Sequence, residues 1–317
     1  MHGSHGMDGA DSAFVFEGNW RDFARIALPN LLLTIVTLGI YRFWATARER
    51  RYLWSRTRFV DENLEWAGTG MELFIGFVMV FVLFGIPYFG LSFVAQALVA
   101  RGYESLGIAL SAFAALAIFY LLGVARFRAL RYRLSRTRWR GIRGGSDTAG
   151  FLFGLSYMWK TAVGWIPAGL LLPWSMTSLW NERWSKMSFG PYAFEADAEA
   201  GNVFARYLLF YRPPFVLFAG GIIMAGMGML AGYGVGGEEG RALGGLIGIF
   251  ALVLFFYFGL GLIAVAFFAK FYREVVGATR WRDLHFTFTA STLDWVKLLV
   301  VDALLVVFTF GIGLVFL

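Results

Sequence analysis

Two groups of arginine residues stand at matching places in the sequence and have the chemistry to bind anions. Residues 51–58 read RYLWSRTR, and eighty positions later residues 131–138 read RYRLSRTR, with six of the eight positions identical. Each guanidinium presents a planar fork of N–H donors that matches a phosphate or a carboxylate. The candidate anion-binding or lipid-binding residues are the arginines of the shared Ser-Arg-Thr-Arg: Arg56, Arg58, Arg136 and Arg138.

The same arginines have a second interpretation. Arginines beside apolar runs mark the cytoplasmic side of a membrane protein and anchor it to lipid phosphates. Their side chains then reach along the apolar surface to the interface without selecting a ligand. The repetition is compatible with a specific site and equally with a packing role that two duplicated segments share.

Three further polar residues lie in apolar surroundings, at positions that an internal alignment makes equivalent. They are Asn30, Lys160 and Asp302, related by spacings of 130 and 272 residues. An ionisable side chain at membrane depth is costly, so it pairs with another or faces a polar cavity. One hypothesis is a polar intramembrane cluster in which Lys160 and Asp302 are counter-ions; the alternative is that all three lie at the wet interface.

Other site chemistry finds little support. The chain has no cysteine, which excludes disulfides, thiolate catalysis and cysteine-bound metals. The three histidines have no partners at metal-ligand spacing, no carboxylate pair suggests acid–base catalysis, and no glycine-rich phosphate loop follows a strand. We therefore predict no catalytic residues, no metal site and no cofactor, and we expect a protein that is not an enzyme.

The composition places these residues in a membrane protein. Hydrophobic residues make up 58% of the chain and charged residues 15%, whereas soluble domains have roughly half and a quarter. Four apolar runs are long enough to cross a bilayer, in two pairs: Leu73–Ala100 with Leu106–Val124, and Leu208–Gly232 with Leu243–Ala269. The net charge of +7 gathers beside these runs. We expect membrane lipids and an anionic small solute as partners, and no nucleic acid; the sequence predicts no oligomeric state.

The internal spacings predict a repeated architecture. After a disordered start at residues 1–13, we expect a single membrane domain over residues 14–317, built from five units: 14–58, 59–138, 139–188, 189–280 and 281–317. Each unit opens with an aromatic stretch that alternates like a strand, followed by a turn and an apolar helical stretch. The predicted strands are Phe14–Phe16, Phe59–Trp66, Trp139–Arg143, Phe189–Phe194 and Trp281–Phe288. The fold class is a mainly α-helical polytopic membrane protein with strand-plus-helical-hairpin units and a small cytoplasmic β-sheet.

Charge predicts the orientation. The arginine-rich segments 42–58 and 126–143, here called the collars, are expected on the cytoplasmic side, and the loops near Arg101 and Glu238 on the outside. The even units are then transmembrane hairpins. The odd units begin and end on one side, so we expect short re-entrant hairpins with breaks near Thr37–Gly39 and Trp165–Pro167; the alternative is one tilted span per odd unit.

The sequence resembles a known family. Phe16-Glu17-Gly18, the run LLLTIVTLGIYRFW at residues 31–44, and Arg50-Arg51-Tyr52 are similar to the YjgN-like family of bacterial inner-membrane proteins. Residues 308–313, FTFGIG, look like a second copy of its Thr, apolar, Gly-Ile signature. The resemblance implies a multi-pass protein of the bacterial cytoplasmic membrane, of uncharacterised function.

Two functions from different classes fit these features. The first is a transporter or channel-like protein for a small or anionic solute, because internal repeats, broken helices and arginine-rich mouths recur in transporters. The second is a non-catalytic lipid-binding or membrane-organising scaffold.

Overall fold

The computed structural model describes residues 13–166, 168–211 and 213–313, so the predicted disordered start lies outside the described residues except for Ala13. The described chain is mostly helical and groups into two compact units. Unit 1 holds the residues up to Met158, Lys186–Ala193 and the residues from Val306 onward; unit 2 holds Trp159–Ser185 and Phe194–Leu305.

Unit 1 begins with a helical hairpin. Helix α1 (Trp20–Val36) starts where the Asn19 side chain accepts a hydrogen bond from the backbone N–H of Arg21, which satisfies a donor that the helix leaves free. It ends at Thr37, and a turn at Leu38 and Gly39, with φ of 50° and 91°, leads into α2 (Arg42–Ser55). The break therefore lies where the sequence predicts it.

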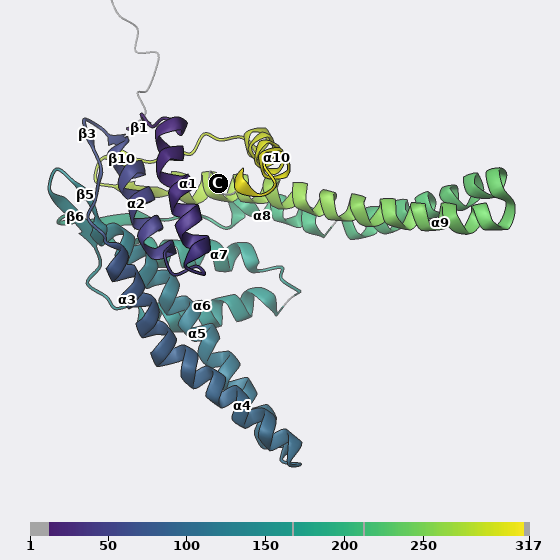
Figure 1. Cartoon of the computed structure of the whole chain (residues 1–317), viewed down its shortest axis with the longest axis horizontal. Helices are drawn as coiled ribbons and strands as arrows, with labels where there is room; N and C mark the ends of the chain where they lie inside the picture. The colour runs from purple at the N-terminus through teal and green to yellow at the C-terminus, as the bar shows by residue number, and fades with distance from the viewer. Residues whose placement is uncertain (1–12, 167, 212, 314–317) are drawn as a thin grey trace, which may run out of the picture. The chain divides into compact units, whose positions relative to one another are not determined.

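A long hairpin follows in the same unit (Figure 1). Its first arm runs from Gly70 to Ala100 as α3 (Gly70–Val80), the π-helical turn η1 (Phe81–Gly85) and α4 (Ile86–Ala100). Its second arm is α5 (Glu104–Arg136), which packs along α4. Both arms are long and apolar enough to cross a membrane, and 0% and 17% of the residues in their most apolar windows are buried within the protein.

Short strands lie near the helix ends of unit 1. Strands β1 (Phe14–Phe16), β2 (Thr57–Phe59) and β3 (Glu62–Asn63) form one antiparallel sheet. In a second ladder, β4 (Glu65–Trp66), β5 (Thr137–Trp139), β6 (Ile142–Gly145), β7 (Ser188–Phe189) and the first residues of β8 (Tyr192–Ala196) pair in that order.

Four of the predicted single strands are tight hairpins instead. In place of continuous strands over Phe59–Trp66, Trp139–Arg143, Phe189–Phe194 and Trp281–Phe288, the chain turns back at Val60, Arg140, Gly190 and Arg282, with φ of 59°, 51°, 60° and 53°. A positive φ is the geometry of the tight hairpin turns whose twist matches that of the flanking strands. The period-two pattern continued through Val60, Arg140 and Arg282 because valine and arginine do not signal a turn; at Gly190 the prediction passed over a residue that favours one.

Unit 2 contains its own helical hairpin. Helix α6 (Phe151–Trp165) contributes its last residues, and a turn with φ of 52° at Ala168 and 82° at Gly169 leads into α7 (Leu172–Trp184). The predicted break is present here too, although Pro167 itself lies outside the described residues.

The rest of unit 2 is a second long helical hairpin with short elements around it (Figure 1). Helix α8 (Gly201–Tyr207) and the 3-10 turn η2 (Leu208–Phe210) precede α9 (Pro213–Gly277), which folds back on itself at Gly236 and Gly237. The predicted span from Leu208 thus starts too early: Leu208–Phe210 forms the 3-10 turn, and α9 restarts at a proline, a residue suited to a first helical turn. Gly236–Gly277 is the third candidate membrane span.

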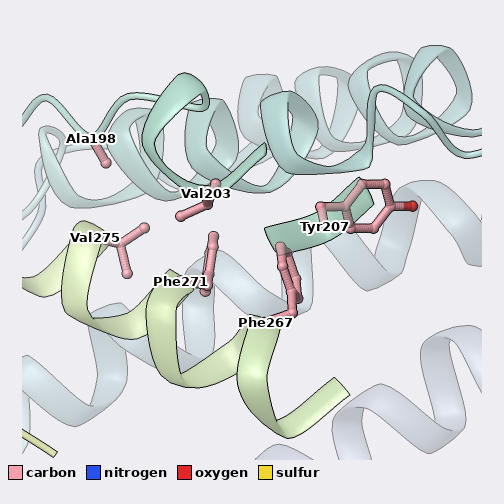
Figure 2. Packing of buried hydrophobic residues seen from close by; sticks show 6 residues of the cluster. All are labelled: Ala198, Val203, Tyr207, Phe267, Phe271 and Val275. Atoms are coloured by element: carbon pink, nitrogen blue, oxygen red, sulfur yellow. The ribbon is translucent and has the colours of Figure 1, made fainter. Parts of the chain in front are cut away.

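The core of unit 2 holds α8 against the last turns of α9. Val203 and Tyr207 of α8 point toward Phe267, Phe271 and Val275, which recur every four residues along α9 (Figure 2). All five are buried, and Val203 and Val275 are fully so. Strands β8, β9 (Thr279–Trp281) and β10 (Leu284–His285) and helix α10 (Thr292–Phe308) complete the unit.

Candidate functional site

One of the predicted anion-binding arginines already has a carboxylate partner inside unit 1. Nε and one terminal nitrogen of Arg136 donate to the two oxygens of Glu72 at 3.0 and 3.2 Å, a bidentate pair. The Tyr132 hydroxyl donates to the same carboxylate at 3.3 Å. Glu72 lies in the first turn of α3, where a negative charge is favourable. The Arg136–Glu72 pair therefore links the C-terminal end of α5 to the first turn of α3.

The other three predicted arginines have different surroundings. Arg58 lies 3.6 Å from the Glu17 carboxylate, and Arg56 lies 5.9 Å from the centre of the Tyr52 ring. Arg138 is exposed on β5, opposite Glu65 and Arg143 in the strand register. Of the four, Arg58 and Arg136 are thus engaged in ion pairs within the protein.

The surface around Arg58 is mixed in charge. A groove of about 710 Å³ lies between the β2–β3 and β5–β6 hairpins, and Arg58 and Arg140 line it together with Glu17, Asp61, Glu62 and Glu65. Arg140 forms an ion pair with Asp61 across the two hairpins. Four carboxylates against two guanidiniums make this groove unfavourable for an anion.

Asn30 is bound across its own hairpin. Its side chain is 2% exposed, and its Nδ2 donates to Glu49 of α2 at 3.1 Å and to the carbonyl of Ala45 at 3.5 Å. Its Oδ1 accepts no hydrogen bond from any described residue. Sequence reasoning missed Glu49, because it sits among the arginines 48, 50 and 51 and reads as part of a solvated charge run.

Lys160 has the same arrangement in unit 2. Its ammonium nitrogen lies 2.7 Å from Glu182 of α7, and the two side chains are only 12% and 17% exposed. Glu182, and not Asp302, is thus the ion-pair partner that the structure gives Lys160. For Asp302, on α10, the structure records no side-chain hydrogen bond or ion pair among the described residues. Glu182 was detectable as the acid that falls on the facing helix of the same predicted hairpin.

The part of the chain that the structure describes offers no cluster of metal ligands. Within residues 13–166, 168–211 and 213–313, no three histidine, aspartate or glutamate side chains gather closely enough to hold a metal ion. Glu17, Asp61 and Glu72 each form an ion pair with an arginine. What the collar regions offer chemically is charge and hydrogen bonding.

Comparison with known proteins assigns the chain to a family. The profile of a family described as bacterial protein of unknown function, DUF898, matches residues 11–317. The chain belongs to the DUF898 family. The predicted resemblance to YjgN-like proteins is confirmed, and this DUF898 member is a bacterial inner-membrane protein.

Individual relatives match a part of the chain. The DUF898 member is 30% identical over 138 residues to inner membrane protein YjgN of Salmonella typhimurium, which covers 44% of this chain and 32% of that protein. It is 31% identical over 137 residues to inner membrane protein YjgN of Escherichia coli O157:H7, which covers 43% and 31%. The alignments thus span about a third of the length of these relatives. No solved structure matches the chain.

Proposed function

We propose that this inner-membrane protein is a non-catalytic scaffold that binds anionic lipid headgroups at its cytoplasmic collars. One observation carries the proposal. Helix α5 continues without a break from its apolar run into a segment that, from residue 126 to residue 143, contains eight arginines and no acidic residue. Arginines beside a membrane surface are attracted to anionic lipids by about 1 kcal/mol each.

The geometry of α5 supports a position of these arginines at the level of the lipid headgroups. The apolar run of α5 ends at Val124, and the same helix continues from Arg126 through a further ten residues to Arg136. Ten residues of α-helix extend about 15 Å, which is the scale of the headgroup region. The positive-inside rule assigns that region to the cytoplasmic side.

The repeated architecture is part of the same proposal. Support comes from the turns that end α1, α6 and α10: Leu38, Ala168 and Phe310 have φ of 50°, 52° and 50°, and each is followed by a glycine with positive φ. These positions are related by the same 130 and 272 spacings that the sequence shows. We infer from them duplicated helical hairpins that dip into the membrane from the cytoplasm, with the strands on that side.

The scaffold explains the polar residues better than transport does. A transporter for an anionic solute needs polar groups that face a passage and stay available to the solute. Asn30 and Lys160 are instead engaged by Glu49 and Glu182 within their own helical hairpins. We therefore place the scaffold ahead of the predicted transporter or channel.

Lipid retention on the purified protein tests the proposal. Native mass spectrometry in a non-ionic detergent should show phosphatidylglycerol retained over phosphatidylcholine. Replacing Arg133 and Arg138 by Gln should weaken that preference by about fivefold for each charge, whereas Arg101→Gln, in the turn between α4 and α5, should leave it unchanged. Equal retention of both lipids overturns the scaffold, and protein-dependent chloride or phosphate flux in proteoliposomes favours the transporter.

A further inference from the structure

Two basic grooves in unit 1 are lined by corresponding residues. Arg48, Arg51, Tyr52 and Ser55 line the first groove, between α1 and α2. Eighty positions later, Arg128, Arg131, Tyr132 and Ser135 line the second groove, beside β6. The shared pattern Arg-x-x-Arg-Tyr-x-x-Ser places its four members on one face of each helix. We propose that each groove is a binding site for the phosphate group of a phosphate ester, a proposal that deepens the lipid-binding function above and rests on it.

Each groove also receives a third arginine from another element. Arg25 of α1 lines the first groove and Arg143 of β6 lines the second. The grooves have volumes of about 400 and about 570 Å³, in the range of small-molecule sites. Three guanidinium forks that converge from two elements match the oxygens of one phosphate, and the remaining space admits the ester group.

The charges of these arginines are largely uncompensated. Among the described residues, the structure records no ion pair for Arg51, Arg131 or Arg143. Arg48 lies 5.6 Å from the centre of the Tyr41 ring, and Arg128 lies 4.9 Å from that of Phe151. A ring contact of this kind holds the guanidinium in place and leaves its charge available.

Two carboxylates oppose the arginines. Arg25 lies 3.8 Å from Asp22, but the two side chains are 83% and 46% exposed, so water screens this pair and it contributes little. Asp147 lines the second groove, so that groove carries one negative charge that the first lacks.

Hydrogen bonds fix the shared face in the same way at both places. The hydroxyl of Ser55 donates to the carbonyl of Tyr52 at 2.9 Å, and that of Ser135 donates to the carbonyl of Tyr132 at 2.9 Å. Each tyrosine ties its helix to the start of an earlier one. The Tyr52 hydroxyl bonds the backbone of Asn19, the N-cap of α1, at 2.9 and 3.0 Å, and the Tyr132 hydroxyl bonds Glu72 of α3.

The third helical hairpin segment of the repeat lacks the pattern that the two collars share. At the positions 130 residues after Arg48, Arg51 and Tyr52, the chain has Ser178, Asn181 and Glu182. That face carries an acid and no arginine at those positions, so a general duplication of basic residues does not account for the pair of grooves. The two grooves of unit 1 are therefore the proposed phosphate sites.

Charge-retaining variants of the whole chain test the proposal. Arg51→Lys with Arg131→Lys keeps the net charge but removes one planar fork from each groove. Isothermal titration of the detergent-solubilised protein with glycerol 3-phosphate, and with short-chain phosphatidic acid in a separate arm, should show affinity about tenfold lower, equal to one charge-assisted hydrogen bond. Arg42→Lys with Arg101→Lys, both exposed and outside the grooves, should leave the affinity within twofold.

The outcomes separate this inference from the scaffold function. If the groove variant binds both ligands as tightly as wild type while phosphatidylglycerol retention persists, the grooves are overturned and the scaffold stands. Binding of the lipid alone identifies a headgroup source, and binding of both identifies the phosphate group itself; either supports the proposal. Asp147→Asn should strengthen binding at the second groove, and a gain of affinity is not explained by misfolding. Unchanged affinity in this variant contradicts the role of the second groove.

Discussion

The ammonium of Lys160 lies 2.7 Å from the carboxylate of Glu182, across the hairpin of α6 and α7. Trp159 flanks it, with its ring centre 5.8 Å from the ammonium nitrogen. Asn30 and Glu49 repeat the arrangement across α1 and α2, with an amide in place of the ammonium. In both hairpins a polar residue of the first helix donates to a glutamate of the second.

Breaking the Lys160 pair from one side should destabilise the protein more than removing both charges. Lys160→Met removes the ammonium group that lies 2.7 Å from the nearly buried Glu182 carboxylate, at a cost of about 3 kcal/mol. The double variant with Glu182→Gln should recover more than half of that loss. Thermal unfolding in detergent measures both, with the exposed Lys297→Met as the control. Additive losses would show that the two side chains are energetically independent.

The two threonines that follow α5 and α9 should both contribute to stability by accepting a hydrogen bond from an indole. Thr137 and Thr279 each donate to the carbonyl four residues earlier, and each accepts an indole N–H, from Trp54 at 2.9 Å and from Trp180 at 3.2 Å. Replacing either by valine should cost about 1–2 kcal/mol, because the indole donor loses its acceptor.

Thr57 is the matched control for these variants. It makes the same bond to the carbonyl of Leu53, at 2.8 Å, and the structure records no indole donor to it among the described residues. Thr57→Val should therefore lower the melting temperature less than Thr137→Val or Thr279→Val. Equal shifts for all three would show that the indole bonds contribute nothing measurable.

Removing Glu72 should loosen the start of α3 from the end of α5. Arg136 and Glu72 are 33% and 38% exposed, so the loss for Glu72→Gln is about 1 kcal/mol after screening. Asp22→Asn removes the partner of Arg25 from an ion pair that is more exposed than Arg136–Glu72. It should change stability by less than about 0.5 kcal/mol. Denaturation of both variants in the same detergent compares them, and a larger effect for Asp22→Asn would contradict this ranking.

Single-cysteine labelling tests the orientation, because the chain has no native cysteine. A cysteine at Ser135 and one at Ser185 should both react only after the inner face is exposed, since both helical hairpins that precede them start and end on one side. A cysteine at Ser105, beside the α4–α5 turn, should react from outside. If the cysteine at Ser185 is labelled from outside while the cysteine at Ser135 is protected, the re-entrant interpretation of α6 and α7 is wrong.

Much of the fold follows from the sequence, and its errors have a common physical origin. Apolar runs predicted α4, α5 and α9, and the breaks expected near Thr37–Gly39 and Trp165–Pro167 fall at or next to the turns at Gly39 and Gly169, because helix length and chain reversal depend on local composition. The hairpin turns at Val60, Arg140 and Arg282 could not be predicted from residue preferences, since neighbouring strands impose their positive φ. Residue types alone do not report such tertiary constraints.

The candidate site was predictable in its location and not in its members. The repeated octets predicted a site at the ends of α2 and α5, where both grooves lie. Within the octets, the Ser-Arg-Thr-Arg portion was the more conspicuous repeat, yet Arg136 and Arg58 have acidic partners. Arg51 and Arg131 belong to the same octets. Each shares a helix face with the arginine three residues earlier, Arg48 or Arg128, and this shared face exists only because both segments are helices.

The turn at Val60 bears on the order in which this protein assembles. Val60 is β-branched and has φ of 59°, a conformation that such residues rarely adopt. A turn of this kind does not start a hairpin by itself; it forms when strands on either side are already held close. Here β2 follows directly from α2 and β5 directly from α5. We therefore expect the helices to insert into the membrane and pack first, and the short strands to pair last.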